Sequence, residues 1–266
     1  MILSAIFCGL VLTNCDSNVD FDTNNEHIKS IWSNGTIVQK YNYDFSGRIV
    51  EENSLYYFKK YIYDTNGRLE KVESAFNTYL LSSSYSPDWE RKEFMTSKNS
   101  EVNSYSLYSY DGTGKLSVIK NYFKETGKDF EYRSMQSVEF DGDNIVKFNY
   151  HEPEGKITQY YIYTYDKYGN VTKEKYYINI FGPENTLESE TSYQYDSYKN
   201  PYRILRMLGN PGLWSNANNI IEVNTTRYRD IPGIDKYSSS KNTYKYNKNG
   251  YPIKVIEDSS EFEYKY

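Results

Sequence analysis

The sequence predicts an all-β protein, either a large curved antiparallel meander sheet or an open or partly closed barrel, with on the order of 14 to 16 strands. Three observations lead to this prediction. One short phrase recurs along the chain, aromatic and polar residues alternate within it, and tyrosine is unusually abundant at 32 of 266 residues. The phrase is interrupted near residues 198–223, where we expect a short helical or irregular loop.

The consensus of the phrase is an aromatic residue, any residue, an aromatic residue, Asp, polar residues ending in Gly, and then a basic residue or Asn before an aliphatic one. Tyr108 and Tyr110 share a face, with Ser109 on the other, as in a half-buried strand. Asp can bond its own backbone two residues on, and Gly can take the positive φ of a four- or five-residue hairpin loop. The copies are YNYDFSGRIV from Tyr41, YIYDTNGRL from Tyr61, YSYDGTGKL from Tyr108, VEFDGDNIV from Val138, YTYDKYGNV from Tyr163, YQYDSYKNP from Tyr193 and YKYNKNGYPI from Tyr244.

The copies follow one another at about the length of one hairpin and its connection, as in arrays of a single supersecondary unit. Two wider intervals, Tyr63 to Tyr110 and Tyr195 to Tyr246, are expected to hide degenerate copies. No linker rich in Pro, Gly or Ser divides the chain, so residues 28–266 are predicted to form a single all-β repeat-like domain. Because tyrosine tolerates a surface that is apolar on one side and wet on the other, the composition favours a thin, solvated sheet or open barrel.

Residues 1–14 are predicted to be a signal peptide, because they begin with an apolar segment too short to span a membrane. The segment 12–15, Leu-Thr-Asn-Cys, resembles the lipobox of bacterial lipoproteins, so Cys15 is the expected site of lipid attachment. Residues 15–27 would then be a lipidated N-terminus and flexible tether. The alternative is an ordinary buried strand with an incidental cysteine. Acidic residues soon after Cys15 resemble the surface-export signals of Bacteroidetes lipoproteins, which implies an outer-membrane location compatible with exposure at the cell surface.

The tyrosine-aspartate phrases, the lipobox, Asn200-Pro201 and the closing KYNKNGYPIKV together resemble Bacteroidetes lipoproteins of unknown function that have a porin-like fold. More loosely, they resemble the tyrosine-aspartate repeats of Rhs-type surface proteins. The resemblance implies a curved, many-stranded antiparallel sheet and no known activity. A pore is not implied, because the strands have one Tyr-rich face and one face of Lys, Asn, Gln and Ser in place of a lipid-compatible band.

Charge and motifs argue against several classes of function. The net charge of −5 and the pI near 5.3 oppose nucleic-acid binding. His27 and His151 belong to no spaced ligand set, so no metal site is predicted. The chain has no nucleophile elbow, phosphate loop or dinucleotide fingerprint, and we expect no cofactor and no enzymatic activity. Since carboxylates are plentiful, a surface glycoside hydrolase is kept as the least favoured alternative.

The interruption at 198–223 contains Pro201, Pro211 and an exposed-looking Trp214. Loops of this length in compact domains are often binding loops or covering elements. The favoured interpretation is a plug, with one or two helical turns over 204–208, that covers the apolar side of the sheet; the alternative is a ligand loop. The residues expected to pack in the plug are Leu205, Met207, Leu208 and Trp214.

The leading functional hypothesis is a non-enzymatic, lipid-anchored binding or interaction module. Its Tyr-rich face would contact a glycan, a peptide or an envelope protein, because tyrosine offers rigid rings with a polar tip. The alternative is a structural envelope lipoprotein without a small ligand, in which the tyrosines are core residues. The expected ligand-binding residues are Trp214, Tyr163, Tyr165, Tyr193 and Tyr195.

Overall fold

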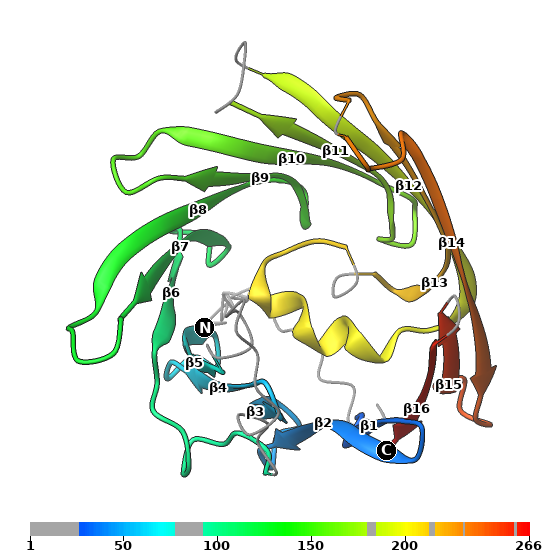
Figure 1. Ribbon diagram of the computed structural model, residues 1–266, viewed down its shortest axis with the longest axis horizontal. Coiled ribbons are helices and arrows are strands. Elements are labelled where there is room, and N and C mark those ends of the chain that lie inside the picture. Colours follow the sequence, from blue (N-terminus) through cyan, green and yellow to red (C-terminus); the bar gives the residue numbers. More distant parts are fainter. Residues whose placement is uncertain (1–26, 78–92, 180–184, 213–215, 231, 258–259) are drawn as a thin grey trace, which may run out of the picture.

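The computed structural model describes residues 27–77, 93–179, 185–212, 216–230, 232–257 and 260–266. Over these residues the chain forms one closed antiparallel barrel in which sequential strands are neighbours and β1 pairs with β16 (Figure 1). The strands are β1 Ser30–Ser33, β2 Thr36–Tyr43, β3 Ile49–Ser54, β4 Tyr57–Tyr63, β5 Leu69–Phe76, β6 Ser104–Tyr110, β7 Leu116–Phe123, β8 Glu131–Asp141, β9 Asn144–His151, β10 Ile157–Tyr165, β11 Val171–Ile178, β12 Thr186–Lys199, β13 Asn218–Arg227, β14 Tyr237–Tyr246, β15 Pro252–Glu257 and β16 Ser260–Lys265. The 3-10 helix η3, Pro201–Leu208, lies between β12 and β13.

The predicted all-β class is confirmed, and the barrel, which the sequence left open or partly closed, is fully closed by hydrogen bonding of Ser30–Ser33 to Phe262–Lys265. Each phrase contributes one even-numbered strand, its turn and the next strand. The expectation of hidden copies in the two wide intervals is wrong, since Tyr63 and Tyr110 end the consecutive even strands β4 and β6. The extra length is a long β5–β6 connection in the first interval, and η3 with its flanks in the second.

In four of the phrase turns an aspartate accepts hydrogen bonds from the backbone of its own loop, and in the last turn Asn247 does so. Asp64 Oδ1 accepts the backbone N–H groups of Asn66 and Arg68, both at 2.9 Å, and Oδ2 accepts from Arg68 Nε at 2.9 Å. Gly67 follows with φ +77°, a conformation that side chains rarely adopt. Burial raises the pKa of the Asp64 carboxyl, but these hydrogen bonds outweigh it and hold the pKa below its ordinary value. The phrase turns, from 44–48 onward, all lie at one end of the barrel, which we call the aspartate end.

The second tyrosine of a phrase joins successive hairpins. Tyr63 donates its hydroxyl to the carbonyl of Ile49 at 2.8 Å, and Arg48 stacks 4.6 Å from the centre of its ring. Tyr110 repeats this arrangement with Leu69 and Arg68. The hydroxyl thus binds the first carbonyl of the preceding return strand, which explains the preference for Tyr over Phe at this position. Equivalent bonds to backbone carbonyls are made by Tyr43, Tyr165, Tyr195, Tyr244 and Tyr266.

The two larger apolar clusters of the wall point into the barrel, and the outward face is largely charged apart from the cluster of Phe58, Ala75 and Met95. One cluster of inward residues spans β1–β5, β15 and β16 and includes Tyr41, Tyr61 and Val255. A second spans β7–β11 and includes Phe148, Tyr163 and Val171. Outward positions carry cross-strand and same-strand ion pairs, among them Lys173–Glu190 at 2.7 Å, Lys71–Glu73 at 2.8 Å and Lys147–Glu139 at 3.1 Å. No helix in the described ranges is long and apolar enough to cross a membrane.

Candidate functional site

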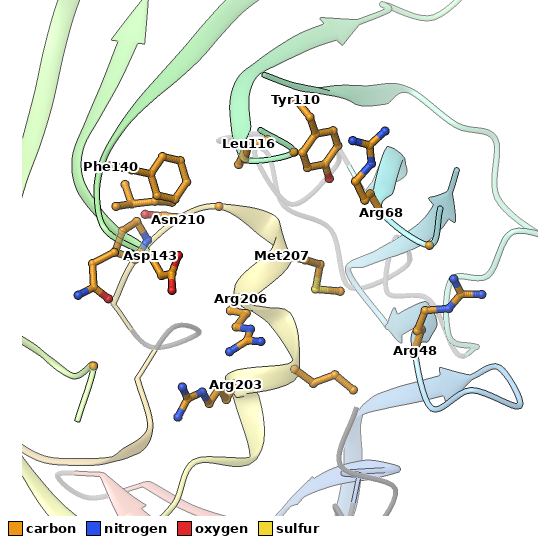
Figure 2. Close-up of a pocket in the computed structure, with 18 of the residues that line it drawn as sticks. Arg48, Arg68, Tyr110, Leu116, Phe140, Asp143, Arg203, Arg206, Met207 and Asn210 are labelled. Atoms are coloured by element: carbon orange, nitrogen blue, oxygen red, sulfur yellow. The ribbon is translucent and has the colours of Figure 1, made fainter. Parts of the chain in front are cut away.

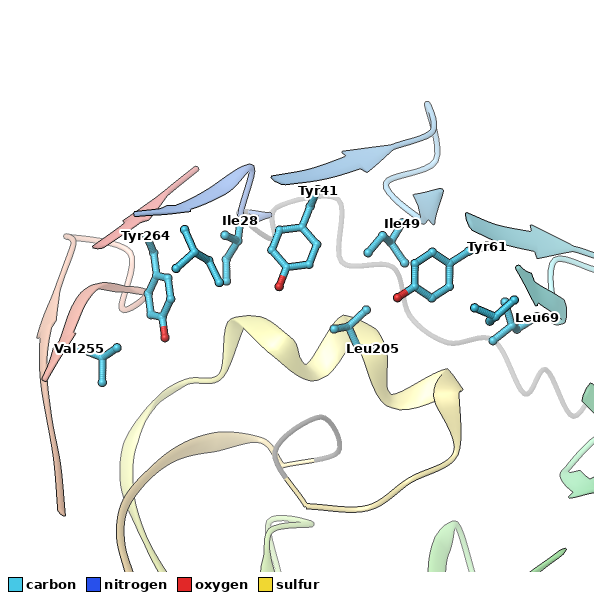
Figure 3. Packing of buried hydrophobic residues seen from close by; sticks show 10 residues of the cluster. Ile28, Tyr41, Ile49, Tyr61, Leu69, Leu205, Val255 and Tyr264 are labelled. Atoms are coloured by element: carbon cyan, nitrogen blue, oxygen red, sulfur yellow. The ribbon is translucent and has the colours of Figure 1, made fainter. Parts of the chain in front are cut away.

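The helix η3 lies inside the ring of strands, as the plug interpretation predicted (Figure 1). It starts where the Asn200 side chain accepts the N–H of Tyr202 at 3.0 Å, and Pro201 supplies a compatible first residue. Leu205 is only 2% exposed and points at Tyr41 and Tyr61 of the wall (Figure 3). The predicted packing of Leu205, Met207 and Leu208 is confirmed, whereas Trp214 lies outside the described residues.

Buried amide side chains tie the base of the plug to the wall. Asn216, 0% exposed, accepts the backbone N–H of Val171 at 2.8 Å, and its carbonyl accepts from Asn200 Nδ2 at 3.1 Å. Asn170 and Asn218 exchange two hydrogen bonds of 3.0 Å across the same junction. Asn170 occupies the position of Arg48, Arg68 and Lys115 in the first three copies, so in the fifth copy an amide that contacts the base of the plug stands in place of a basic side chain.

The C-terminal end of η3 passes very close to the wall. Gly209 has φ +80°, and a Cβ placed on it would lie 2.2 Å from Leu116 Cδ2. Only glycine can hold this left-handed end against the wall without displacing Leu116.

A cavity of about 570 Å³ lies between η3 and the turns of the aspartate end (Figure 2). Its walls combine aromatic rings, aliphatic groups and the arginines of two turns and of the plug. The residues that line it include Arg48, Tyr63, Arg68, Tyr110, Leu116, Phe140, Asp143, Ile145, Tyr165, Arg203, Ile204, Arg206, Met207 and Asn210.

The arginines of the cavity differ in their partners. Arg48 and Arg68 form ion pairs with Asp44 and Asp64, each with an N–O distance of 2.8 Å, and these pairs stabilise the turns. Arg203 and Arg206 are exposed on η3, and the spacing of three residues puts them on one side of a 3-10 helix (Figure 2). Within the ranges that the structure covers, Arg203 has no ion pair, so η3 adds positive charge to the cavity.

The predicted site residues separate into two groups. Tyr165 lines the cavity, but its hydroxyl is bound to the Ile145 carbonyl at 2.7 Å, as that of Tyr195 is to Val171 at 2.5 Å. Tyr163, 4% exposed, and half-buried Tyr193 belong to the wall further inside. Cys15 lies outside the described residues, like Trp214. The sequence analysis did not single out Arg203 and Arg206, although a basic pair three residues apart in YRILRML was visible.

Burial disfavours the charge of Glu174 and raises the pKa of its carboxyl group to about 7. A glycoside hydrolase needs two cooperating carboxyl groups. The described part of the chain also holds no group of three or more His, Cys, Asp or Glu able to bind a metal.

No protein-family model and no curated protein matches the chain. Among solved structures, a porin-like protein from Bacteroides vulgatus ATCC 8482 is similar with a TM-score of 0.51 and 12% identity, over 91% of this chain and 99% of that one. This likeness confirms the porin-like fold, and at such identity it concerns the fold alone. A porin-like protein from Bacteroides uniformis ATCC 8492 matches with a TM-score of 0.42 and 9% identity, over 90% of this chain and 97% of the other, too low a score for further argument.

Proposed function

We propose that the protein is a lipid-anchored envelope barrel that binds an acidic glycan in the cavity beside η3. The observation that carries this proposal is the pair Arg203 and Arg206 on the plug, which line a cavity whose other walls include several aromatic rings. A guanidinium group can hold a carboxylate with two parallel hydrogen bonds, and it keeps its charge at every physiological pH. The rings of Tyr63, Tyr110 and Phe140 offer apolar surface for the body of a sugar.

The charge of the cavity favours an anion. The turn arginines are already neutralised by aspartates, and Asp143, the acidic residue of the lining, lies 3.5 Å from Lys115 Nζ. Among the described residues, this leaves the charge of Arg203 in excess, in a chain whose net charge is −5. A locally positive cavity in an acidic protein selects for anions by attraction at the site, while the rest of the surface repels them.

The ligand experiment compares two probes that have the same sugar chain and differ in the charge of their carboxyl groups. Trigalacturonate is titrated calorimetrically into the full chain, beside its methyl ester. We expect the acid to bind, and the double variant Arg203→Ala/Arg206→Ala to weaken binding at least about tenfold, since a hydrogen bond to a charged group contributes about 1.5 to 3 kcal/mol. Lys245→Ala, which removes an exposed charge on β14, is the matched control and should bind like the wild type.

Equal affinity for the acid and its ester, or for the double variant and the control, would refute an anion site on η3. A complete lack of binding would favour the second candidate, a structural envelope lipoprotein. That candidate is supported by the hydroxyls of Tyr43, Tyr63 and Tyr110, which bind the backbone of the barrel.

The anchoring part of the proposal rests on Cys15 and on the outer wall. Ion pairs such as Lys173–Glu190 and Lys254–Glu261 at outward positions are suited to water, whereas charges facing acyl chains destabilise a membrane barrel. A lipid on Cys15 would hold such a barrel at a membrane without inserting it. We expect Cys15→Ser to move the protein from the membrane fraction to the soluble fraction of cells that process lipoproteins. Persistence of the variant in the membrane fraction would contradict lipid attachment at Cys15.

A further inference from the structure

The helix η3 packs on one side of the barrel interior. On the opposite side, the segment after the helix approaches Leu116 through Gly209 and Val171 through Asn216, both at the aspartate end, and no described η3 side chain covers the rest. The residues Tyr202, Ile204, Met207 and Leu208 of η3 pack on the cluster of β1–β5, β15 and β16. None of the described η3 residues belongs to the cluster of β7–β11. The inward residues of that uncovered wall are rich in tyrosine: Phe148, Tyr150, Tyr161, Tyr163, Tyr176 and Tyr193.

These rings form a continuous aromatic surface across three strands. Tyr161 of β10 stacks on Tyr176 of β11 with ring centres 4.7 Å apart, and Tyr150 of β9 meets Tyr161 edge-on at 5.9 Å. Tyr163 continues the surface, 6.2 Å from Tyr161. The described residues give the hydroxyls of Tyr150, Tyr161, Tyr163 and Tyr193 no hydrogen-bond partner, in contrast with the tyrosines that bind carbonyls at the aspartate end.

Glu174 lies in the middle of this surface. On β11 it is the cross-strand neighbour of Tyr163 on one side and Thr191 on the other. Its side chain is half-buried, and the described part of the chain supplies neither a hydrogen bond nor an ion pair to its carboxylate. An unpaired carboxylate is costly to desolvate, and burial raises the pKa of Glu174 to about 7. Its charge in turn raises the pKa values of Tyr150, Tyr161, Tyr163 and Tyr193, after the larger effect of their own burial.

Nearer the other end of the barrel, the inner face becomes polar. Asn121 of β7 donates to Gln136 at 2.8 Å and to Ser134 at 3.1 Å, and Ser106 donates to Asn121 at 2.7 Å. Gln136 is the cross-strand neighbour of Tyr150. The aromatic surface around Glu174 is therefore continuous with a polar part of the inner wall. A charged solute that approaches along this polar part can keep its hydration.

We propose that the interior face of β9–β12 binds an organic cation, with Glu174 as its counter-ion and the faces of Tyr150, Tyr161 and Tyr163 as its aromatic contacts. A cation over tyrosine rings is attracted by their negative faces, and a carboxylate at the same place supplies the opposite charge. A hard metal ion fits less well, since it needs several oxygen ligands and the described residues hold no group of three or more His, Cys, Asp or Glu that could bind one. The site shares no residue with the anion cavity beside η3, so either can exist without the other.

The experiment compares choline with 3,3-dimethylbutan-1-ol, a neutral molecule of the same shape, in calorimetric titrations of the full chain. We expect choline to bind more tightly than the alcohol, and Glu174→Gln to lower the affinity for choline at least about tenfold, the effect of losing one charge contact. Glu139→Gln, which changes an outward carboxylate paired with Lys147, is the matched control and should bind like the wild type. Because Glu174→Gln removes an unpaired charge, its melting temperature should equal or exceed that of the wild type, which shows that the fold is kept.

A pH series gives a second reading of the same site. Lowering the pH from about 8 to about 5 should weaken choline binding in the wild type and leave Glu174→Gln unchanged, since protonation removes the counter-ion. Tyr150 of β9, Tyr161 and Tyr163 of β10, Tyr176 of β11 and Tyr193 of β12 face Glu174 with raised pKa values and stay neutral throughout. Glu188 and Arg229, which act on Tyr176, form their own ion pair at 3.2 Å. Equal affinities for choline and the alcohol, or for Glu174→Gln and the wild type, would overturn the proposal.

Discussion

Replacing Glu52 with alanine is expected to lower the free energy of unfolding by about 3 to 5 kcal/mol, the usual cost of removing one partner from a buried charged network. Glu52 of β3 is 4% exposed and points into the barrel. Tyr57 and Tyr61 donate their hydroxyls to its two carboxylate oxygens at 2.6 and 2.7 Å, Gln39 donates to the first, and Lys59 Nζ lies 3.6 Å from the second. Alanine would leave all four groups without their common acceptor.

The loss should exceed that of any single donor. Tyr57→Phe removes one hydrogen bond to a carboxylate that keeps its other partners, so we expect a cost of about 1 to 3 kcal/mol. Glu263→Ala is the matched control, because Glu263 lies on β16 in an exposed ion pair with Lys265 and its loss should change the stability far less than that of Glu52. Urea unfolding followed by tyrosine fluorescence measures all three. If Glu52→Ala and Glu263→Ala unfold at the same urea concentration, the network around Glu52 does not stabilise the barrel.

Replacing Leu205 with alanine is expected to cost about 2 to 5 kcal/mol, the range for a large-to-small change that leaves a cavity in a core. Leu205 is the side chain of η3 that inserts between Tyr41 and Tyr61, and it is the fully buried contact of the plug with this wall (Figure 3). The helix is short and gains little from its own hydrogen bonds, so its position depends on this contact and on the amides at its base.

Hydrogen exchange separates loss of the plug from loss of the barrel. In Leu205→Ala, the amides of 202–208 should exchange faster than in the wild type, by more than the amides of β2 and β4. Leu205→Met keeps the volume and should cost less than about 1.5 kcal/mol. Ile253→Ala, on the outward face of β15 and 40% exposed, is the control and should change stability by about 0.5 kcal/mol or less. Equal effects of Leu205→Ala and Ile253→Ala would mean that the plug does not depend on Leu205.

The local parts of the fold could be predicted because their causes lie within a few residues. Asp64 bonds the backbone N–H groups of its own turn, and Tyr61 and Tyr63 share a face by the geometry of a strand. The plug could be anticipated for a related reason: the prolines and glycines of 198–223 interrupt the repeat, and its apolar residues needed a surface to cover. The predicted thin, solvated sheet is only partly right, since the closed barrel buries rings such as Tyr41 and Tyr163.

The sites could not be predicted to the same degree. Tyr163 and Tyr165 look alike in the sequence, yet Tyr165 uses its hydroxyl to hold Ile145, and no described group binds that of Tyr163. Which role a tyrosine takes depends on whether its ring lies beside the bulged start of the preceding return strand. The sequence pattern did not indicate a role for Glu174, because a glutamate between two lysines on a strand is typical of a solvent-exposed position. Its aromatic neighbours are known only from the pairing of the strands.

The sequence by itself determined the all-β class, the hairpin unit, the inward side of the tyrosines and the existence of a covering element, since each follows from contacts over a few residues. Only the tertiary structure decided that β1 meets β16, that η3 packs on one wall, and that Arg203 and Glu174 face separate parts of the interior. Closure depends on the twist and stagger summed over the whole sheet, and a small change per strand would leave it open. The positions of the charged side chains inside the barrel depend on this arrangement of all the strands, so they cannot be predicted from a local sequence pattern.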